Sequence, residues 1–398
     1  MVGNRDPLGV KFLVRRFSFI VSRFSLTRPG NPYTSRSLAQ RETRNAYCYA
    51  QAMSKMLDEI REQPAALERT LQAERKPIEK LRSLLEREKP RLIMLVARGT
   101  SDNAAQFGRY LLEVATGIPV TLAAPSVFTL YHAKFNFDGI LVIAISQSGE
   151  STDTNLVLER AREQGTRTIG ITNEADSTLA RLAEQVFLVH AGREKSVAAT
   201  KTYTGQLLVL YMLAHALGAN IALDDLTRIP EWAQAALGLE PEIARRAERY
   251  RFMDHALVVG RGLNYANAFE FALKLMETCY VVAERFSSAD LLHGPIAMVE
   301  ASFPAFLFAP GGVTWPGIRE MIEKLANLKA ETLIISDPSN QEAFSLNGRT
   351  ISIPVPLDEL FTPIPYIIPA QLFAACLAAQ KGLNPDHPRT ISKVTRTM

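Results

Sequence analysis

The sequence predicts an α/β fold made of two tandem copies of one domain. Short runs rich in Ile, Val and Leu, which are typical of buried parallel strands, alternate with helical segments of about 10 to 15 residues. The second half of the chain also repeats the first at a nearly constant offset of about 163 to 165 residues. Each copy is therefore expected to be a parallel sheet between two layers of helices, as in flavodoxin-like and Rossmann-like folds.

The first copy is expected to open with an amphipathic helix and to continue as βαβ units. The runs 91–97 and 139–145 are long and apolar enough to be central strands. The expected strands are 91–97, 120–123, 139–145, 168–171 and 185–190, and the expected helices are 56–85, 103–114, 152–164 and 201–217.

The second copy is identified by its correspondence with the first. Four segments of the second copy correspond to segments of the first: 255–262 to 92–99, strand 303–309 to 140–145, strand 332–335 to 168–171, and helix 366–381 to 201–217. Pro230 and Pro241 interrupt the helical pattern of residues 224–245, so the copies are expected to join there. The predicted domains are 53–245 and 246–398.

Composition narrows the class of protein. Of 398 residues, 47% are hydrophobic and 22% charged, which is typical of a globular chain. We expect no apolar stretch of the roughly 18 to 20 residues that span a bilayer, and hence no membrane partner. Three widely spaced cysteines and six scattered histidines show neither a disulfide framework nor metal-ligand spacing. This usage favours the cytoplasm and predicts no metal.

The positive charge is confined to one end of the chain. Residues 1–52 hold nine Lys and Arg against two acids, a charge of +7 within a total of +4. A basic tail on a slightly acidic body does not indicate nucleic-acid binding. The tail resembles a transit peptide in being rich in Arg and Ser. We favour a disordered extension, or a true start at Met53 or Met56, because a good helical pattern begins only there.

A dense set of hydroxyl groups follows the strand 139–145. Four Ser or Thr residues, a Gln and a Gly lie within residues 146–152, where a helix is expected to start. These groups could simply cap that helix. They are too many for one cap, however, and they lie at the carboxyl end of a parallel strand, where such sheets bind ligands. We therefore predict a phosphate cradle. Its counterpart at 309–314 has lost nearly all its hydroxyls.

Candidate acid–base groups lie in the second copy. Lys274 and Glu277 are three residues apart on one helical face, a spacing that also suits a solvated ion pair. His293 precedes Gly294-Pro295 in a turn and has a side chain suited to proton transfer, although a lone His is more often structural. Lys393 would by default be a solvated tail lysine.

Six motifs in order resemble those of the sugar isomerase (SIS) family. The arrangement is similar to the isomerase half of glucosamine-6-phosphate synthase over roughly residues 55 to 398, whereas the segment 124–131 looks more like stand-alone SIS-type glucosamine-6-phosphate deaminases. The matching segments are 99–101, 146–150, 197–201, 272–277, 293–295 and 388–393.

The resemblance implies a dimer that binds a sugar phosphate between SIS domains. We expect no metal or organic cofactor, because an enediol-type intermediate needs only a positioned base and oxyanion donors. In that family Glu277 would move a proton between C1 and C2, His293 from the partner subunit would open the sugar ring, and Lys393 would close over the substrate and contact or condense with its carbonyl. The phosphate would be held by Ser101, Ser146, Gln147, Ser148 and Ser151, and the substrate further contacted by Gly99, Thr100, Val197, Ala198 and Lys274.

Two departures from the synthase shape the expected reaction. We expect no glutaminase domain with an N-terminal cysteine, and Ala199 replaces a serine of the synthase motif. The lead hypothesis is an isomerising deaminase that converts glucosamine 6-phosphate to fructose 6-phosphate and ammonia. Alternatives are a related amino-sugar or fructosamine phosphate deaminase, a ketose–aldose isomerase, an ammonia-using synthase, and a regulator that senses sugar phosphates.

Overall fold

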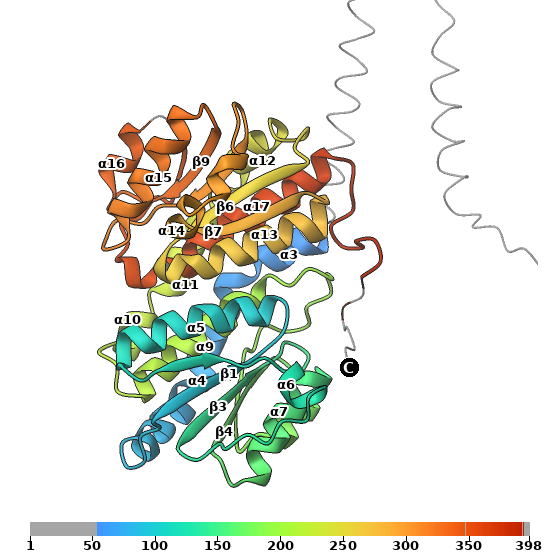
Figure 1. Ribbon diagram of the computed structural model, residues 1–398, viewed down its shortest axis with the longest axis vertical. Helices are drawn as coiled ribbons and strands as arrows, with labels where there is room; N and C mark the ends of the chain where they lie inside the picture. The colour runs from blue at the N-terminus through green and yellow to red at the C-terminus, as the bar shows by residue number, and fades with distance from the viewer. Residues whose placement is uncertain (1–53, 347, 392, 394–398) are drawn as a thin grey trace, which may run out of the picture. The chain divides into compact units, whose positions relative to one another are not determined.

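Two five-stranded parallel sheets organise the computed structural model, which describes residues 54–346, 348–391 and 393 (Figure 1). The expectations for residues 1–52 lie outside this part of the chain. The first sheet has the order β2-β1-β3-β4-β5 and the second β10-β9-β8-β6-β7, which is the same flavodoxin-like order read from the other end. The strands are β1 (Leu92–Val96), β2 (Val120–Leu122), β3 (Ile140–Ile145), β4 (Thr168–Thr172), β5 (Gln185–Leu188), β6 (His255–Gly260), β7 (Val282–Ser287), β8 (Pro304–Phe308), β9 (Glu331–Ser336) and β10 (Arg349–Ser352).

Helices cover both faces of each sheet, which confirms the predicted αβα architecture. In the first copy α5 (Thr100–Thr116) and α9 (Lys201–Ala216) pack on one face, and α7 (Thr152–Glu163) and α8 (Thr178–Leu182) on the other. In the second copy α13 (Tyr265–Cys279) and α17 (Pro363–Gln380) pack on one face and α15 (Trp315–Asn327) on the other. The remaining helices are α3 (Lys55–Arg61), α4 (Gln63–Leu85), α6 (Ser126–Thr129), α10 (Leu223–Leu226), α11 (Ile229–Leu237), α12 (Glu240–Glu248), α14 (Ser288–Leu292) and α16 (Gln341–Ser345).

The two copies share one hydrophobic core. Helix α5 contacts α13, and α9 contacts α17, so the inner helical layers of the two sheets pack on each other. The largest buried cluster accordingly contains residues of both copies, including Leu210 on α9 and Ile367 on α17. Two smaller clusters lie beneath the outer helices. This shared core brings the start of α5 close to the middle of α13.

Prolines begin helices where the sequence pattern suggested interruptions. Pro230 and Pro241 lie in the first turns of α11 and α12, where a missing N–H costs nothing. These helices pack on α17, so the expected junction at residues 224–245 is folded structure. Pro64 likewise starts α4 and divides the expected helix 56–85 into two helices.

Helix α17 corrects the expectation that no apolar stretch reaches membrane-spanning length. Its 18 residues have a mean hydropathy of 1.2, enough by length and composition to cross a bilayer. However, 89% of that stretch is buried inside the fold. Its apolar surface is therefore used to join the two copies.

Candidate active site

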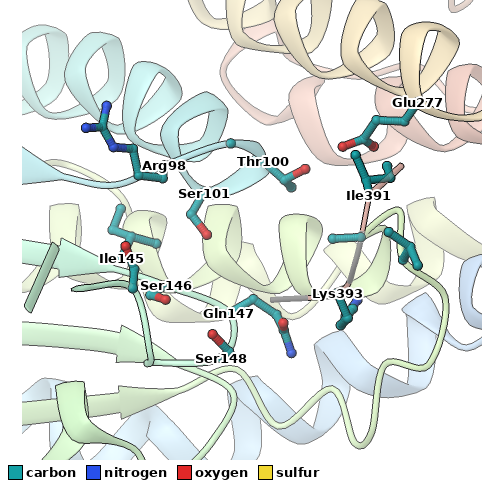
Figure 2. Close-up of a pocket in the computed structure, with 14 residues that line it drawn as sticks. Arg98, Thr100, Ser101, Ile145, Ser146, Gln147, Ser148, Glu277, Ile391 and Lys393 are labelled. Carbon is teal, nitrogen blue, oxygen red and sulfur yellow. The ribbon is translucent and has the colours of Figure 1, made fainter. Parts of the chain in front are cut away.

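A cavity of about 610 Å³ opens at the carboxyl ends of β1 and β3 (Figure 2). The sheet order reverses between these two strands, and ligands of open α/β sheets bind at such a point. The lining residues come from both copies and from the C-terminal segment: Arg98, Gly99, Thr100, Ser101, Ile145, Ser146, Gln147, Ser148, Ser151, Val197, Ala199, Glu277, Ile391 and Lys393.

Four serine hydroxyls of this cavity each keep a proton available for a ligand. Ser101 Oγ accepts a hydrogen bond from Gln206 Nε2 (3.0 Å), and Ser146 Oγ accepts one from the Gly149 N–H (3.1 Å). Ser148 Oγ accepts from the Glu150 N–H (3.3 Å), and Ser151 Oγ accepts from Thr154 Oγ1 (3.0 Å). A hydroxyl whose lone pair is occupied in this way is oriented to donate. The four together suit an anion.

Backbone geometry at the cradle supports the same conclusion. Ser151 occupies the N-cap position of α7, yet its side chain makes no capping hydrogen bond, so its hydroxyl is not used for the cap. Gly149 adopts a φ of +66°, and its carbonyl accepts hydrogen bonds from Leu179 N–H and Asn155 Nδ2. The loop is thus held fixed at the amino end of a 12-residue helix, whose dipole favours negative charge.

Arg98 adds a cation that the sequence analysis did not predict. Its guanidinium bonds Asp153 Oδ2 at 2.7 and 3.1 Å, and its side chain remains 49% exposed where it lines the cavity. The signal available in the sequence was its position one residue before Gly99, directly after the first strand.

The equivalent position of the second copy is filled by the chain itself. Glu359 accepts hydrogen bonds from the backbone N–H and hydroxyl of Thr314 (3.3 and 2.5 Å). A Cβ added at Gly312 would lie 2.1 Å from Glu359 Oε2, so this carboxylate sits directly against the loop. An anion from the same molecule therefore takes the place that a bound phosphate could have occupied.

A buried charge cluster faces the cradle across the cavity. Lys274 is fully buried, and its Nζ lies 2.6 Å from Glu277 Oε2, 3.4 Å from Glu270 Oε1 and 3.2 Å from Thr100 Oγ1. Glu277 is 24% exposed and turns toward the cavity (Figure 2). The solvated ion pair considered from the spacing is not what forms, because Lys274 has no contact with solvent.

Burial and charge set the protonation states in this cluster. Burial disfavours a charge on Lys274, but the carboxylates of Glu270 and Glu277 raise its pKa and keep it an ammonium ion. Burial raises the pKa of Glu270 to about 7, against the attraction of Lys274 and a hydrogen bond from Asn103. The ammonium group of Lys274, 2.6 Å from Glu277 Oε2, thus orients the Glu277 side chain at the cavity wall.

The C-terminal segment is docked at two points. Arg389 donates its N–H to the hydroxyl of Tyr280 (2.9 Å), and its guanidinium stacks over that ring at 4.0 Å. Lys393 Nζ contacts Glu194 Oε2 (3.1 Å) and the carbonyl of Ser196 (2.6 Å). Burial opposes ionisation of Glu194, but Lys393 and hydrogen bonds from Thr200 and Thr202 lower its pKa overall.

Most of the predicted site residues meet in this cavity, and three do not line it. Ala198 is fully buried beside the cavity, and its neighbour Ala199 takes the lining position. Lys274 is buried behind Glu277 and holds its carboxylate by an ion pair. His293 is exposed at the end of α14 and lines no part of the cavity of its own chain. Glu194 and Glu270 were missed, although each flanks a predicted motif.

Comparisons with known proteins agree with this geometry. The SIS domain family matches the chain twice, over residues 87–216 and 252–381. The chain belongs to the SIS family. The predictions from sequence that the chain is an SIS protein and that it is an enzyme are confirmed.

Relatives and solved structures place this SIS protein beside amino-sugar enzymes. A glutamine–fructose-6-phosphate aminotransferase (isomerizing) of Pyrococcus horikoshii is 36% identical over 345 residues, which cover 85% of this chain and 57% of that enzyme. This SIS protein thus spans little more than half the length of such relatives. The C-terminal domain of glucosamine-fructose-6-phosphate aminotransferase from Francisella tularensis superposes with a TM-score of 0.78 at 28% identity, covering 84% of this chain and 98% of that domain. Glucosamine-6-phosphate deaminase of Thermotoga maritima shares the fold, with a TM-score of 0.66 at 22% identity over 86% of this chain and its own full length.

Among residues 54–346, 348–391 and 393, no group of three or more His, Cys, Asp or Glu side chains is arranged to hold a metal ion.

Proposed function

We propose that this SIS protein is an isomerising deaminase that converts glucosamine 6-phosphate and water into fructose 6-phosphate and ammonia. The observation that carries the proposal is one cavity with an anion cradle on one side and the oriented carboxylate of Glu277 on the other (Figure 2). A sugar phosphate anchored through its phosphate would extend its sugar carbons toward Glu277. The relatives support the sugar class, because their names specify fructose 6-phosphate and amino transfer.

The proposed chemistry is a proton shift followed by hydrolysis. In the open-chain sugar, Glu277 takes the proton from C2 while the C1 aldehyde becomes an enol, which gives an enolamine. Return of the proton to C1 leaves an imine at C2 and an alcohol at C1. Water adds to the imine carbon and the C–N bond breaks, which releases ammonia and leaves the C2 ketone of fructose 6-phosphate. Water is the only co-reactant that this direction needs.

Lys393 is the cation best placed to act on the carbonyl end of the substrate. It lines the same cavity as Glu277, and its present partners, Glu194 and the Ser196 carbonyl, hold it at the wall. We propose that the segment 388–393 encloses the substrate and that Lys393 contacts the sugar oxygen or carbonyl. Exclusion of water by this segment would strengthen each electrostatic contact inside.

Ring opening requires a group that one chain does not bring to its own cavity. His293 is exposed and absent from the lining, so we propose a homodimer in which His293 of the partner subunit reaches the site. The Gly294-Pro295 turn that follows it presents the ring at the surface, with Gly294 at a φ of +132°.

We also propose that the protein works in the cytoplasm. Cys279 is a buried thiol that forms no disulfide, a state typical of a reducing compartment. The chain's relatives are metabolic enzymes of sugar phosphates.

The second candidate function is the reverse reaction, in which fructose 6-phosphate and ammonia give glucosamine 6-phosphate. The observation in its favour is the similarity to aminotransferases. Ala199 leaves the wall without the hydroxyl expected in the synthase motif, which could also suit a different amino-sugar or fructosamine phosphate.

One experiment separates these candidates. Purified full-length protein is incubated with glucosamine 6-phosphate, fructosamine 6-phosphate, glucose 6-phosphate, and fructose 6-phosphate with ammonium, while ammonia and each sugar phosphate are measured. We expect equal amounts of ammonia and fructose 6-phosphate from glucosamine 6-phosphate. Turnover confined to fructosamine 6-phosphate, or a simple exchange between glucose and fructose phosphates, would replace the proposal with the corresponding alternative.

A further inference from the structure

A second cavity lies at the edge of the second sheet that is formed by β9 and β10. Its volume is about 370 Å³, within the range of small-molecule sites. It lies at the amino ends of β9 and β10, whereas the candidate active site lies at the carboxyl ends of strands in the first sheet. The lining residues are Arg245, Arg246, Arg249, Tyr250, Leu333 and Arg349, and we call this cavity the arginine pocket.

Positive charge exceeds negative charge in the arginine pocket. Glu331 is shared, because Arg249 bonds its two oxygens at 2.8 and 3.1 Å and Arg349 pairs with the same carboxylate. Arg246 pairs with Glu242 at 2.6 Å. The exposed side chain of Arg245, in helix α12, makes no hydrogen bond or ion pair with the other residues that the structure describes. The four guanidinium groups are therefore only partly neutralised by two carboxylates, and the pocket keeps a net charge of about +2.

Three of the four guanidinium groups, those of Arg246, Arg249 and Arg349, are also held in place. Arg246 donates to the Thr350 carbonyl at 2.8 Å, and Tyr250 donates its hydroxyl to Glu331 at 3.3 Å. The ring of Tyr250 packs against Phe306 and Phe373 of the core, at centroid distances of 5.5 and 5.4 Å. Arginines fixed by such contacts lose little freedom when they bind an anion. Tyr250 and Leu333, each only 1% exposed, form the buried floor beneath the charges.

We infer that the arginine pocket binds the phosphate group of a small phosphorylated metabolite, at a site separate from the candidate active site. A phosphate monoester carries a charge of about −1.5 to −2 near pH 7, which matches the excess positive charge. One guanidinium group can donate two parallel hydrogen bonds to a phosphate. The Arg245 side chain has no partner among the described residues, and three further arginines line the same pocket. The volume of about 370 Å³ exceeds that of phosphate alone, so the pocket has room for an organic group of the ligand beside the arginines.

The test is a titration of the full-length protein with inorganic pyrophosphate by calorimetry at constant ionic strength. Constant ionic strength matters because salt screens exposed charges. Wild-type protein is expected to show two binding events, one in each cavity. Arg245→Ala and Arg349→Ala should weaken one event about tenfold, the effect of losing one hydrogen bond to a charged group. Ser148→Ala should weaken the other event and leave the first unchanged.

Two further variants test the assignment of charge. Glu331→Gln removes the carboxylate that competes for Arg249 and Arg349, so it should tighten the pocket's binding event. Arg319→Ala is the matched control, because Arg319 is a half-exposed arginine of the same domain that pairs with Glu323 and Glu342 outside the pocket. A single event that Ser148→Ala removes and Arg245→Ala leaves intact would overturn the inference. The exposed Arg245 side chain makes no hydrogen bond or ion pair with another described residue, so this variant is expected to fold.

Discussion

The proposed reaction depends above all on the carboxylate of Glu277. Replacing it by Gln keeps the shape of the side chain and its contact with Lys274 but removes the base. We expect ammonia release from glucosamine 6-phosphate to fall by about 10²- to 10⁴-fold, the usual contribution of general base catalysis. Exchange of the C2 hydrogen with deuterated solvent, followed by NMR, should fall in parallel.

The matched control for this variant is Glu284→Gln, which changes an exposed glutamate of β7 in the same domain. It should retain wild-type turnover and exchange. If Glu277→Gln released ammonia at the wild-type rate, Glu277 would not be the base.

Each cradle hydroxyl should contribute to binding of the phosphate group. Ser148→Ala removes one O–H donor and should raise KM for glucosamine 6-phosphate about tenfold while kcat changes less. Glucosamine without its phosphate provides the internal comparison, because its weak turnover should be the same in both proteins. An equal loss with both sugars would indicate that Ser148 acts elsewhere than on the phosphate.

At the scale of the element, the loop between β3 and α7 requires glycine at position 149. Its φ of +66° is unfavourable for other residues, and an added Cβ would lie 2.1 Å from Ser177 Oγ and 2.3 Å from Ser177 Cβ. Gly149→Ala should therefore displace the cradle and lower stability by about 1 to 3 kcal/mol. Thermal unfolding and KM for the sugar phosphate measure the two effects. Gly165→Ala, with a similar φ of +72° but no atom within 4 Å of the added Cβ, separates backbone strain from the clash.

The C-terminal segment is expected to depend on Glu194 for its closed position. Glu194→Gln places an amide where Lys393 now meets a carboxylate, so the segment should be cleaved faster by protease and kcat should fall about tenfold. Protection of the segment by a substrate analogue should return part of the lost resistance. Cleavage and kcat both equal to wild type would show that Glu194 does not hold the segment.

The same contact predicts a pH dependence. The pKa of Glu194 lies below its usual 4.5 in the folded protein, so its stabilising contribution is fully present above pH 4.5. That contribution is lost as pH falls through the lower folded value. Protease resistance of the segment should therefore be constant from neutral pH to about 4.5 and decline below it. In Glu194→Gln this decline should be absent.

Comparison of individual elements shows which parts of the structure could be predicted from sequence. The central strands β1 and β3 were predicted because both faces are buried and their residues are uniformly apolar. Strand β7 was missed, since it lies at a sheet edge, is partly exposed and includes Glu284 and Arg285. The cradle was visible because its hydroxyls are dense in sequence. The burial of Lys274 could not be predicted from sequence, because the spacing of Lys274 and Glu277 is the same whether solvent or helix α5 covers the lysine.

At the scale of the whole molecule, the position of His293 separates it from the other proposed catalytic groups. Glu277 and Lys393 line the same cavity of one chain, whereas His293 is exposed just after the end of α14. If His293 acts in the partner's cavity, each site of a dimer combines Glu277 of one chain with His293 of the other. Two inactive variants could then restore activity together.

Co-expression of His293→Ala and Glu277→Gln chains tests this arrangement. Random assembly makes half of the dimers mixed, and each mixed dimer has one intact site and one site with both changes, so about a quarter of wild-type activity should return. Co-expression of Glu277→Gln with Lys393→Ala is the control, because these residues share a cavity within one chain and no combination restores a site. Ammonia release is measured on mixed dimers isolated by two affinity tags, where the intact site should give about half of wild-type activity. Failure of the first pair to recover, with each chain shown to be folded and dimeric, would place His293 in its own subunit's chemistry or outside catalysis altogether.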